Sequence, residues 1–381
     1  MTLPGEQPPV TDLEEDPGPL ADQTGDAATT PETALPPPGV AAMPGTLGIV
    51  SRGLDLNVAA SAEIRRASLY IGLLSLLSLG PIAATLWAFS ARQGGFEWLQ
   101  RLARGLRPDF VPVGPGFGEL FAVILLIGLA CLLAVTVDAQ LLATILIGAK
   151  ATGRRFSLGA ALALARLRYW RFVRASAMVG VILVLPRFLI NQVVMNGQPA
   201  GTEAQALIVS AIDILLSTPF AYVAAGIVLG AVGARESIGR SWRLAQARWR
   251  LALLIGIVNT AVTYIAGFAV GAGGDILVRL GTAFGLGGST GPVQIGVLAL
   301  IVAVAIVSIG SLIMTIGALT AGPQVVAFLG LTGYSSGLDA LNDPADPSAQ
   351  PPGAPLISLP MQLALVINAA LATLSLIFLL R

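Results

Sequence analysis

The sequence predicts an all-α protein, a polytopic bundle of transmembrane helices. Charged residues make up 11% of the 381-residue chain, less than half of their share of about 25% in soluble domains. Hydrophobic residues make up 55%, and the mean hydropathy is +0.81. The apolar residues lie in long uncharged runs that reach the roughly 20 residues needed to cross a bilayer as a helix.

The composition divides the chain into four segments. Residues 1–50 hold eight acidic residues, ten prolines and no Lys or Arg, which predicts a disordered acidic tail. Residues 51–331 predict a six-span membrane domain, residues 332–358 a proline-rich flexible linker, and residues 359–381 a C-terminal transmembrane helix. The tail lacks the apolar core of a signal peptide, so we expect the first span to direct insertion.

Seven apolar runs predict the spans, and the charged residues between them predict their orientation. The sixth run is expected to end at Gly322-Pro323. Seven basic residues in 150–174 and five in 235–250 place these segments, and the N-terminus, in the cytoplasm. The four arginines of 92–116 do not fit this orientation, because it places the 92–116 loop on the outer side of the membrane. The runs are about 69–91, 117–148, 172–195, 205–234, 250–273, 293–321 and 359–380.

The chemistry available to the chain argues against an enzyme. The sequence contains no histidine, and Cys131 is its single cysteine. Histidine-dependent nucleophiles, zinc sites and internal disulfides are therefore excluded, and we predict no catalytic residue, no metal site and no cofactor. Residues 51–381 carry 22 basic and 13 acidic residues, a net charge of +9. The basic clusters flank apolar runs, so anionic lipid headgroups are the expected partners rather than nucleic acid.

Two arginine-rich segments resemble each other at a spacing of 80 residues. Residues 157–171 and 237–250 share a Ser-x-Gly start, a Leu-Ala pair and an arginine, and residues 57–66 are a fainter copy. The repeat predicts three units of an interfacial helix plus two spans, over about 55–150, 157–235 and 237–330. The residues expected to face lipid at the interface are Arg168, Trp170, Arg171, Arg240, Trp242, Arg243, Trp249 and Arg250. They serve either anchoring alone or a specific lipid or protein docking site.

The stretch ESIGRSWRLAQARWRLALLIGIV (236–258) is similar to a motif in the membrane domain of glycerophosphoryl diester phosphodiesterases and of related bacterial multi-pass proteins. LTGYSSGLD (331–339) resembles the closing stretch of that domain, so the likeness covers roughly residues 50–335. The resemblance implies the membrane-domain fold in a bacterial plasma membrane. Catalytic activity does not transfer, because the phosphodiesterase barrel and its histidines are missing.

Three ionisable residues lie inside the predicted spans, where a charge is costly and marks pairing or function. Arg187 and Asp213 are each 13 residues from position 200, so a tight hairpin brings them to the same depth as an ion pair. Asp138 is expected to join them in one intramembrane charge cluster. The cluster either fixes helix packing or lines a path for a substrate or proton.

Glycine patterns complete the prediction. Gly226/Gly230 and Gly267/Gly271 are GxxxG pairs, which serve helix packing or dimerisation. Nine glycines in 267–291 predict an outer loop or re-entrant turn. Together these observations favour a non-catalytic membrane scaffold, or a module that interacts with lipid or a partner, with the acidic tail as a candidate site for a protein partner. The alternative is a transporter or translocation subunit that uses the Asp/Arg cluster.

Overall fold

The computed structural model describes residues 45–92, 117–154, 156–197, 203–283, 292–341 and 357–380, in which all regular structure is helical. The predicted tail up to residue 44, the arginine-rich loop 93–116 and most of the linker lie outside these ranges. The elements are α1 Thr46–Ala59, α2 Ser61–Arg92, α4 Phe117–Ala151, α5 Leu158–Gly197, α6 Glu203–Ser217, η2 Thr218–Phe220, α7 Val223–Val228, α8 Ala234–Ala247, α9 Trp249–Ala283, α10 Pro292–Thr332, η3 Ser336–Leu341 and α11 Leu359–Leu380.

Six helical segments in the described part of the chain are long and apolar enough to cross a membrane. They are Ser61–Thr85, Leu126–Ala151, Leu158–Ile190, Leu207–Val228, Trp249–Gly274 and Ala299–Thr332. The all-helical, multi-span class predicted from the sequence is therefore confirmed. In α11 only the shorter stretch Met361–Ala370 is comparably apolar within the side chains described, so the seventh span stays a prediction.

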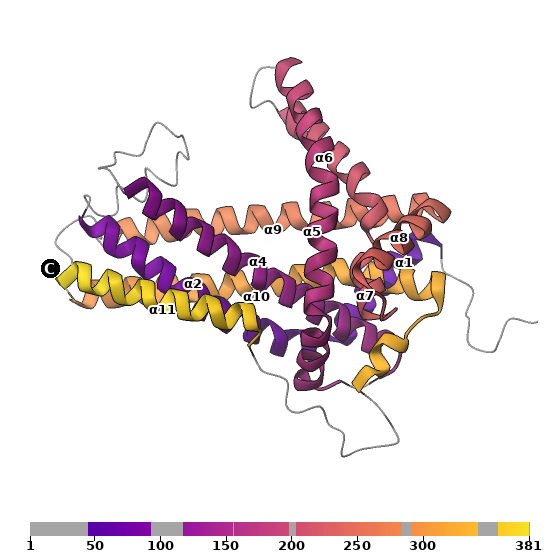
Figure 1. Ribbon diagram of the computed structural model, residues 1–381, viewed down its shortest axis with the longest axis horizontal. Coiled ribbons are helices and arrows are strands. Elements are labelled where there is room, and N and C mark those ends of the chain that lie inside the picture. Colours follow the sequence, from indigo (N-terminus) through magenta and orange to yellow (C-terminus); the bar gives the residue numbers. More distant parts are fainter. Residues whose placement is uncertain are drawn as a thin grey trace, which may run out of the picture. The chain divides into compact units, whose positions relative to one another are not determined.

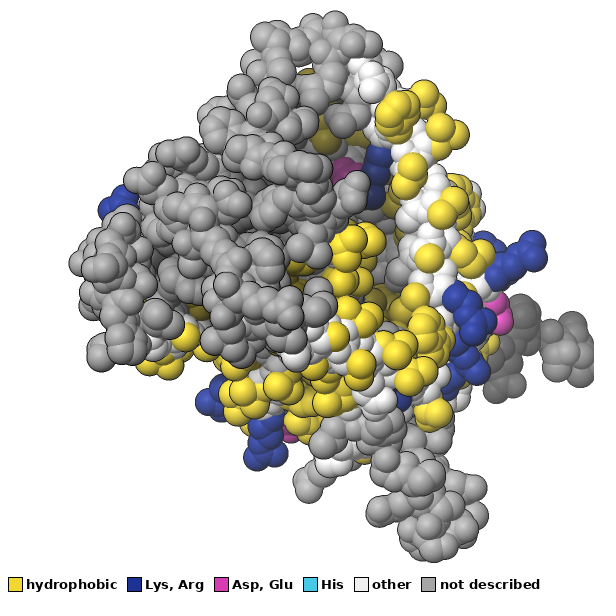
Figure 2. Space-filling model, turned by 60° about the vertical axis from the view of Figure 1, so that its left-hand side comes forward, with side chains coloured by type: hydrophobic (Ala, Val, Ile, Leu, Met, Phe, Trp, Pro, Cys, Tyr) yellow, Lys and Arg dark blue, Asp and Glu magenta, His cyan; other side chains and the backbone are white. Residues whose placement is uncertain are grey.

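The helices pack around α10 and the second half of α4. Helix α10 contacts α1, α2, α4 and α9, and α11 lies against α2 and α4. Figure 1 shows α2, α4, α9, α10 and α11 running alongside one another, whereas α5 and α6 cross them. Every residue from Leu141 to Ala149 is buried, so this part of α4 is enclosed on all its faces. In Figure 2, hydrophobic side chains cover much of the described surface and most basic side chains lie at its margins.

Several predicted helix boundaries are wrong. Helix α10 continues through Pro323 to Thr332, and α9 continues through the first part of the glycine-rich segment to Ala283. The predicted interfacial helix 157–171 and the third span form one continuous helix, α5. Proline and glycine are tolerated inside membrane helices because neighbouring groups and small local adjustments satisfy the freed backbone groups. The three-unit repeat is not confirmed, because the fainter copy 57–66 straddles the end of α1 and the start of α2, and the middle copy is continuous with its span in α5.

Glycines bring the backbones of α1 and α10 into contact beside Pro323, which lies inside the continuous α10. A Cβ atom on Gly53 would lie 2.6 Å from the Pro323 nitrogen, and one on Gly322 would lie 2.6 Å from the Gly53 carbonyl oxygen. The two backbones therefore touch, and any side chain at either position would push them apart.

The C-terminal helix packs on the bundle. Asn368 of α11 is fully buried and donates a hydrogen bond of 2.5 Å from Nδ2 to the Ser78 carbonyl of α2. The same amide lies 3.7 Å from the Cys131 sulfur of α4. A buried amide that bonds to two other helices fixes α11 in one register.

Candidate functional site

The predicted charge cluster is divided into two ion pairs in the structure. Asp138 of α4 is completely buried and forms an ion pair with Arg166 of α5, whose Nη2 also donates to the Tyr70 hydroxyl of α2 at 3.2 Å. Arg166 reaches this depth because α5 is continuous from Leu158, instead of beginning with a separate interfacial helix. This pair therefore joins α2, α4 and α5 inside the bundle.

The second pair joins the two helices of the predicted hairpin. Arg187 Nε of α5 lies 2.5 Å from Asp213 Oδ1 of α6, so the matching depth inferred from the sequence is present. The two side chains are 46% and 47% exposed. The pair is not enclosed by protein, in contrast to Asp138 and Arg166.

The fourth span is broken where the sequence predicted one helix. Helix α6 ends at Ser217, and a single 3-10 turn with Pro219 leads to the short α7. Ser241 of α8 accepts a hydrogen bond from the Tyr222 N–H (3.1 Å) and donates one to the Pro219 carbonyl (2.8 Å). Ser237 of α8 donates to the Val223 carbonyl at 2.8 Å. The break is thus stabilised by side chains that replace the missing helical bonds, as non-helical backbone at membrane depth requires.

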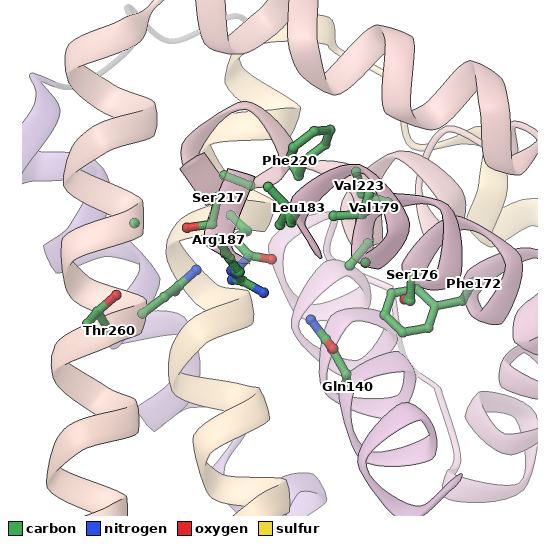
Figure 3. Close-up of a pocket in the computed structure, with 16 residues that line it drawn as sticks. Gln140, Phe172, Ser176, Val179, Leu183, Arg187, Ser217, Phe220, Val223 and Thr260 are labelled. Atoms are coloured by element: carbon green, nitrogen blue, oxygen red, sulfur yellow. The ribbon is translucent and has the colours of Figure 1, made fainter. Parts of the chain in front are cut away.

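A cavity of about 400 Å³ lies beside this break, between α4, α5, α9 and α10. Figure 3 shows the Gln140 amide and the Arg187 guanidinium projecting into it, with Thr260 on another wall. Its apolar wall includes Phe172, Leu183 and Phe220. Two further cavities adjoin it: one of about 270 Å³ shares the lining residues Gln140, Asn259 and Gln324, and one of about 320 Å³ shares Arg187 and includes Asp213.

From the sequence, Gln140 and Asn259 were expected only as polar neighbours of the charge cluster, and Gln324 was not assigned to any site. Gln324 is 6% exposed, and Asn259 Oδ1 is buried with no hydrogen-bond partner among the described residues. One signal for them is readable in the sequence. Thr136/Gln140, Asn259/Thr263 and Thr320/Gln324 each place a threonine and an amide four residues apart, hence on one face of a helix.

Most of the predicted interfacial residues lie at the surface. Trp170, Trp242 and Trp249 are 50%, 45% and 42% exposed, and the Arg171, Arg243 and Arg250 side chains are exposed as well. Arg240 is held more firmly, by an ion pair of 3.0 Å with Glu236 and by the ring of Tyr334, 5.1 Å from its guanidinium carbon.

Arg168 is the exception to the predicted lipid-facing set. It is only 7% exposed, because the segment that carries it belongs to the continuous α5 and turns this side chain toward neighbouring helices. Its Nε has no hydrogen-bond partner in the part of the chain that the structure describes. The prediction that it faces lipid is wrong.

The two GxxxG pairs differ in their surroundings. A Cβ atom on Gly226 would lie 2.6 Å from Ser237 Oγ, so this glycine lets α8 approach the broken span. Nothing lies within 4 Å of such an atom on Gly267 or Gly271. The first pair therefore serves packing inside the bundle, and the second leaves an open face among the residues described.

The fold and these features define the class of the protein, a multi-pass α-helical membrane protein. No protein-family model, characterised protein or solved structure matches the chain. The resemblance to the phosphodiesterase membrane domain stays a prediction from the motif. Among the described residues, no group of three or more Asp, Glu or Cys side chains could hold a metal ion.

Proposed function

We propose that this protein is a non-catalytic membrane module that engages anionic lipid headgroups through α8. The observation that carries the proposal is the division of α8 into two faces. Ser237, Ser241 and Ala245 are buried against the bundle, whereas Trp242 and Arg243 are exposed. A helix with aromatic rings and guanidinium groups on its free face suits the boundary between headgroups and acyl chains.

The charge of α8 supports an anionic lipid as the partner. Helix α8 itself holds three arginines and one glutamate, and Arg248 and Arg250 at its junction with α9 raise the net charge of residues 234–250 to +4. A basic residue near an anionic membrane surface contributes about 1 kcal/mol to the attraction. Because the buried face of the same helix holds the broken span, a headgroup bound to α8 would lie one helix away from the cavities.

The test compares lipids retained by the purified protein. Arg243→Gln/Arg250→Gln should lower retention of an anionic phospholipid, and loss of about 2 kcal/mol corresponds to roughly a 30-fold weaker affinity. The matched control is Arg52→Gln, which removes an exposed arginine from α1. Native mass spectrometry in neutral detergent, with phosphatidic acid and phosphatidylcholine as probes, measures the lipid retained by the double variant and by the control. Equal retention by the double variant and the control would reject the proposal.

A second candidate function is transport, with the protein as a transporter or translocation subunit. It is favoured by the broken fourth span beside polar cavities, since transporters place substrate sites at interrupted helices. In a Cys131→Ser background, cysteines at Gln324 and Asn259 should react with a membrane-impermeant thiol reagent, whereas one at the buried Leu142 should not. Absence of labelling from either side of the membrane would remove this candidate.

The acidic tail supports a further part of the scaffold hypothesis, recruitment of a protein partner. Its eight acidic residues and ten prolines suit a basic binding surface on a cytoplasmic protein. Deletion of residues 2–44 should abolish co-purification of such a partner and leave lipid retention unchanged. A partner that still co-purifies after the deletion, with lipid retention reduced, would show that the tail does not recruit it.

A further inference from the structure

Three helices turn the same kind of polar pair toward one cavity. Helix α4 contributes Thr136 and Gln140, α9 contributes Asn259 and Thr263, and α10 contributes Thr320 and Gln324, and all six line the cavity of about 270 Å³. The three amides also line the neighbouring cavity of about 400 Å³. Three spans far apart in the sequence therefore assemble one polar surface inside an apolar bundle.

The hydrogen-bonding state of these groups indicates what they would bind. The threonine hydroxyls donate to carbonyls of their own helices: Thr136 to Leu133, Thr263 to Asn259 and Thr320 to Ile316, at 2.8 to 3.0 Å. Their remaining lone pairs accept, and so does Asn259 Oδ1, which is buried without a partner among the described residues. Primary amides both donate and accept. A ligand must therefore supply several donors and acceptors together, as neighbouring hydroxyl groups do.

The charges around the cavities indicate a neutral ligand. No described residue that lines the smaller cavity is charged, and the larger cavity adds only Arg187, which is paired with Asp213. A phosphate or an ammonium group in the smaller cavity would lose its hydration without gaining a counter-charge. Neutral hydroxyl groups lose far less hydration free energy on entering the cavity. The amides and threonines then replace the hydrogen bonds that these hydroxyl groups made to water.

The shape of the site indicates a carbon skeleton beside the hydroxyl groups. The larger cavity is lined by the apolar side chains Phe172, Leu183 and Phe220 as well as by the shared amides. Its volume of about 400 Å³ falls in the range of small-molecule sites, about 300–1,000 Å³.

We propose that the Thr136/Gln140, Asn259/Thr263 and Thr320/Gln324 pairs form a binding site for a neutral polyhydroxyl group, a sugar or a polyol. The group arrives either as a free solute or as the headgroup of a neutral glycolipid. This site is separate from α8, and the inference holds whether or not α8 binds anionic lipid.

The test uses the full chain in nanodiscs with two neutral probes, methyl glucoside and a monoglucosyl diacylglycerol in phosphatidylcholine. Asn259→Leu and Gln324→Met remove one amide each at similar volume and should weaken binding about threefold to tenfold each, as expected for one neutral hydrogen bond. Gln192→Met, an exposed glutamine of α5, is the matched control and should bind as the wild type does.

The outcomes separate the two sources and the alternatives. Binding of the glycolipid alone supports a lipid headgroup, and binding of methyl glucoside supports a free sugar or polyol. Without ligand, the two variants should melt no lower than the wild type, because each loses a side-chain amide that has no hydrogen-bond partner among the described residues. Binding of neither probe, or a clear loss of thermal stability with unchanged binding, would overturn the inference. Arg243→Gln/Arg250→Gln should bind the neutral probes normally, so failure of the α8 proposal is recognised independently.

Discussion

The buried pair Asp138–Arg166 should contribute far more to stability than the exposed pair Arg187–Asp213. Asp138 is 0% exposed and Arg166 10%, so Asp138→Leu alone leaves a guanidinium group inside the bundle without its carboxylate. Removal of one partner from a buried ion pair costs about 3–5 kcal/mol. Replacement of both, as in Asp138→Leu/Arg166→Met, removes the uncompensated charge and should restore most of this loss.

The half-exposed pair is the internal comparison. Arg187 and Asp213 lie inside candidate spans but line the open cavity of about 320 Å³, where water would stabilise each charge separately; an ion pair in contact with water contributes about 0–1 kcal/mol. Asp213→Leu should therefore lower the free energy of unfolding by no more than about 1 kcal/mol, although Arg187 and Asp213 form a contact of 2.5 Å. The difference between the two sites comes from burial, since both are Arg–Asp contacts.

The assay is a double-mutant cycle on the purified protein. Unfolding in dodecyl maltoside by added SDS, followed by circular dichroism, gives the free energy for each single and double variant. The expected coupling at Asp138 and Arg166 is up to about 3 kcal/mol, against a few tenths at Arg187 and Asp213. Similar coupling energies at the two sites, or a double variant as unstable as Asp138→Leu, would refute the argument from burial.

Three further substitutions test the packing of the bundle. Gly53→Ala should lower the free energy of unfolding in SDS titrations by about 1–3 kcal/mol, because its methyl group would meet the Pro323 backbone. Gly267→Ala, which faces open space, should leave the free energy unchanged. Equal effects of the two substitutions would place the α1–α10 crossing elsewhere. Ser241→Ala should lower the melting temperature, since it leaves the Tyr222 N–H and the Pro219 carbonyl unpaired, which destabilises the fold by about 1–3 kcal/mol. Ser51→Ala, at an exposed position, should leave the melting temperature unchanged. Asn368→Cys should form a disulfide with Cys131 under mild oxidation, which mass spectrometry detects. Thr373→Cys, at an exposed position of α11, should not form this disulfide. Cross-linking of both variants, or of neither, would contradict the docking of α11.

Features set by residues close together in the sequence could be predicted, whereas features set by contact with a distant segment could not. The pairing of Arg187 with Asp213 followed from their equal spacing around a hairpin turn. Asp138 was assigned to the same cluster because the sequence shows depth but not direction, and its partner Arg166 was hidden in a segment interpreted as interfacial. Pro323 was expected to end α10, but the helix continues to Thr332, with the Gly53 backbone of α1 packed against the proline.

By itself, the sequence determined the class of this protein, because the length of apolar runs and the scarcity of charge are local properties that decide whether a helix can lie in a bilayer. It also determined that histidine chemistry is absent and that residues 235–250 are rich in arginine and tryptophan. Only the tertiary structure decided where the fourth span breaks, since that break depends on hydrogen bonds from Ser237 and Ser241 of another helix. It alone brought Gln140, Asn259 and Gln324 to one cavity, because the rotation of each helix about its axis is fixed by packing against its neighbours.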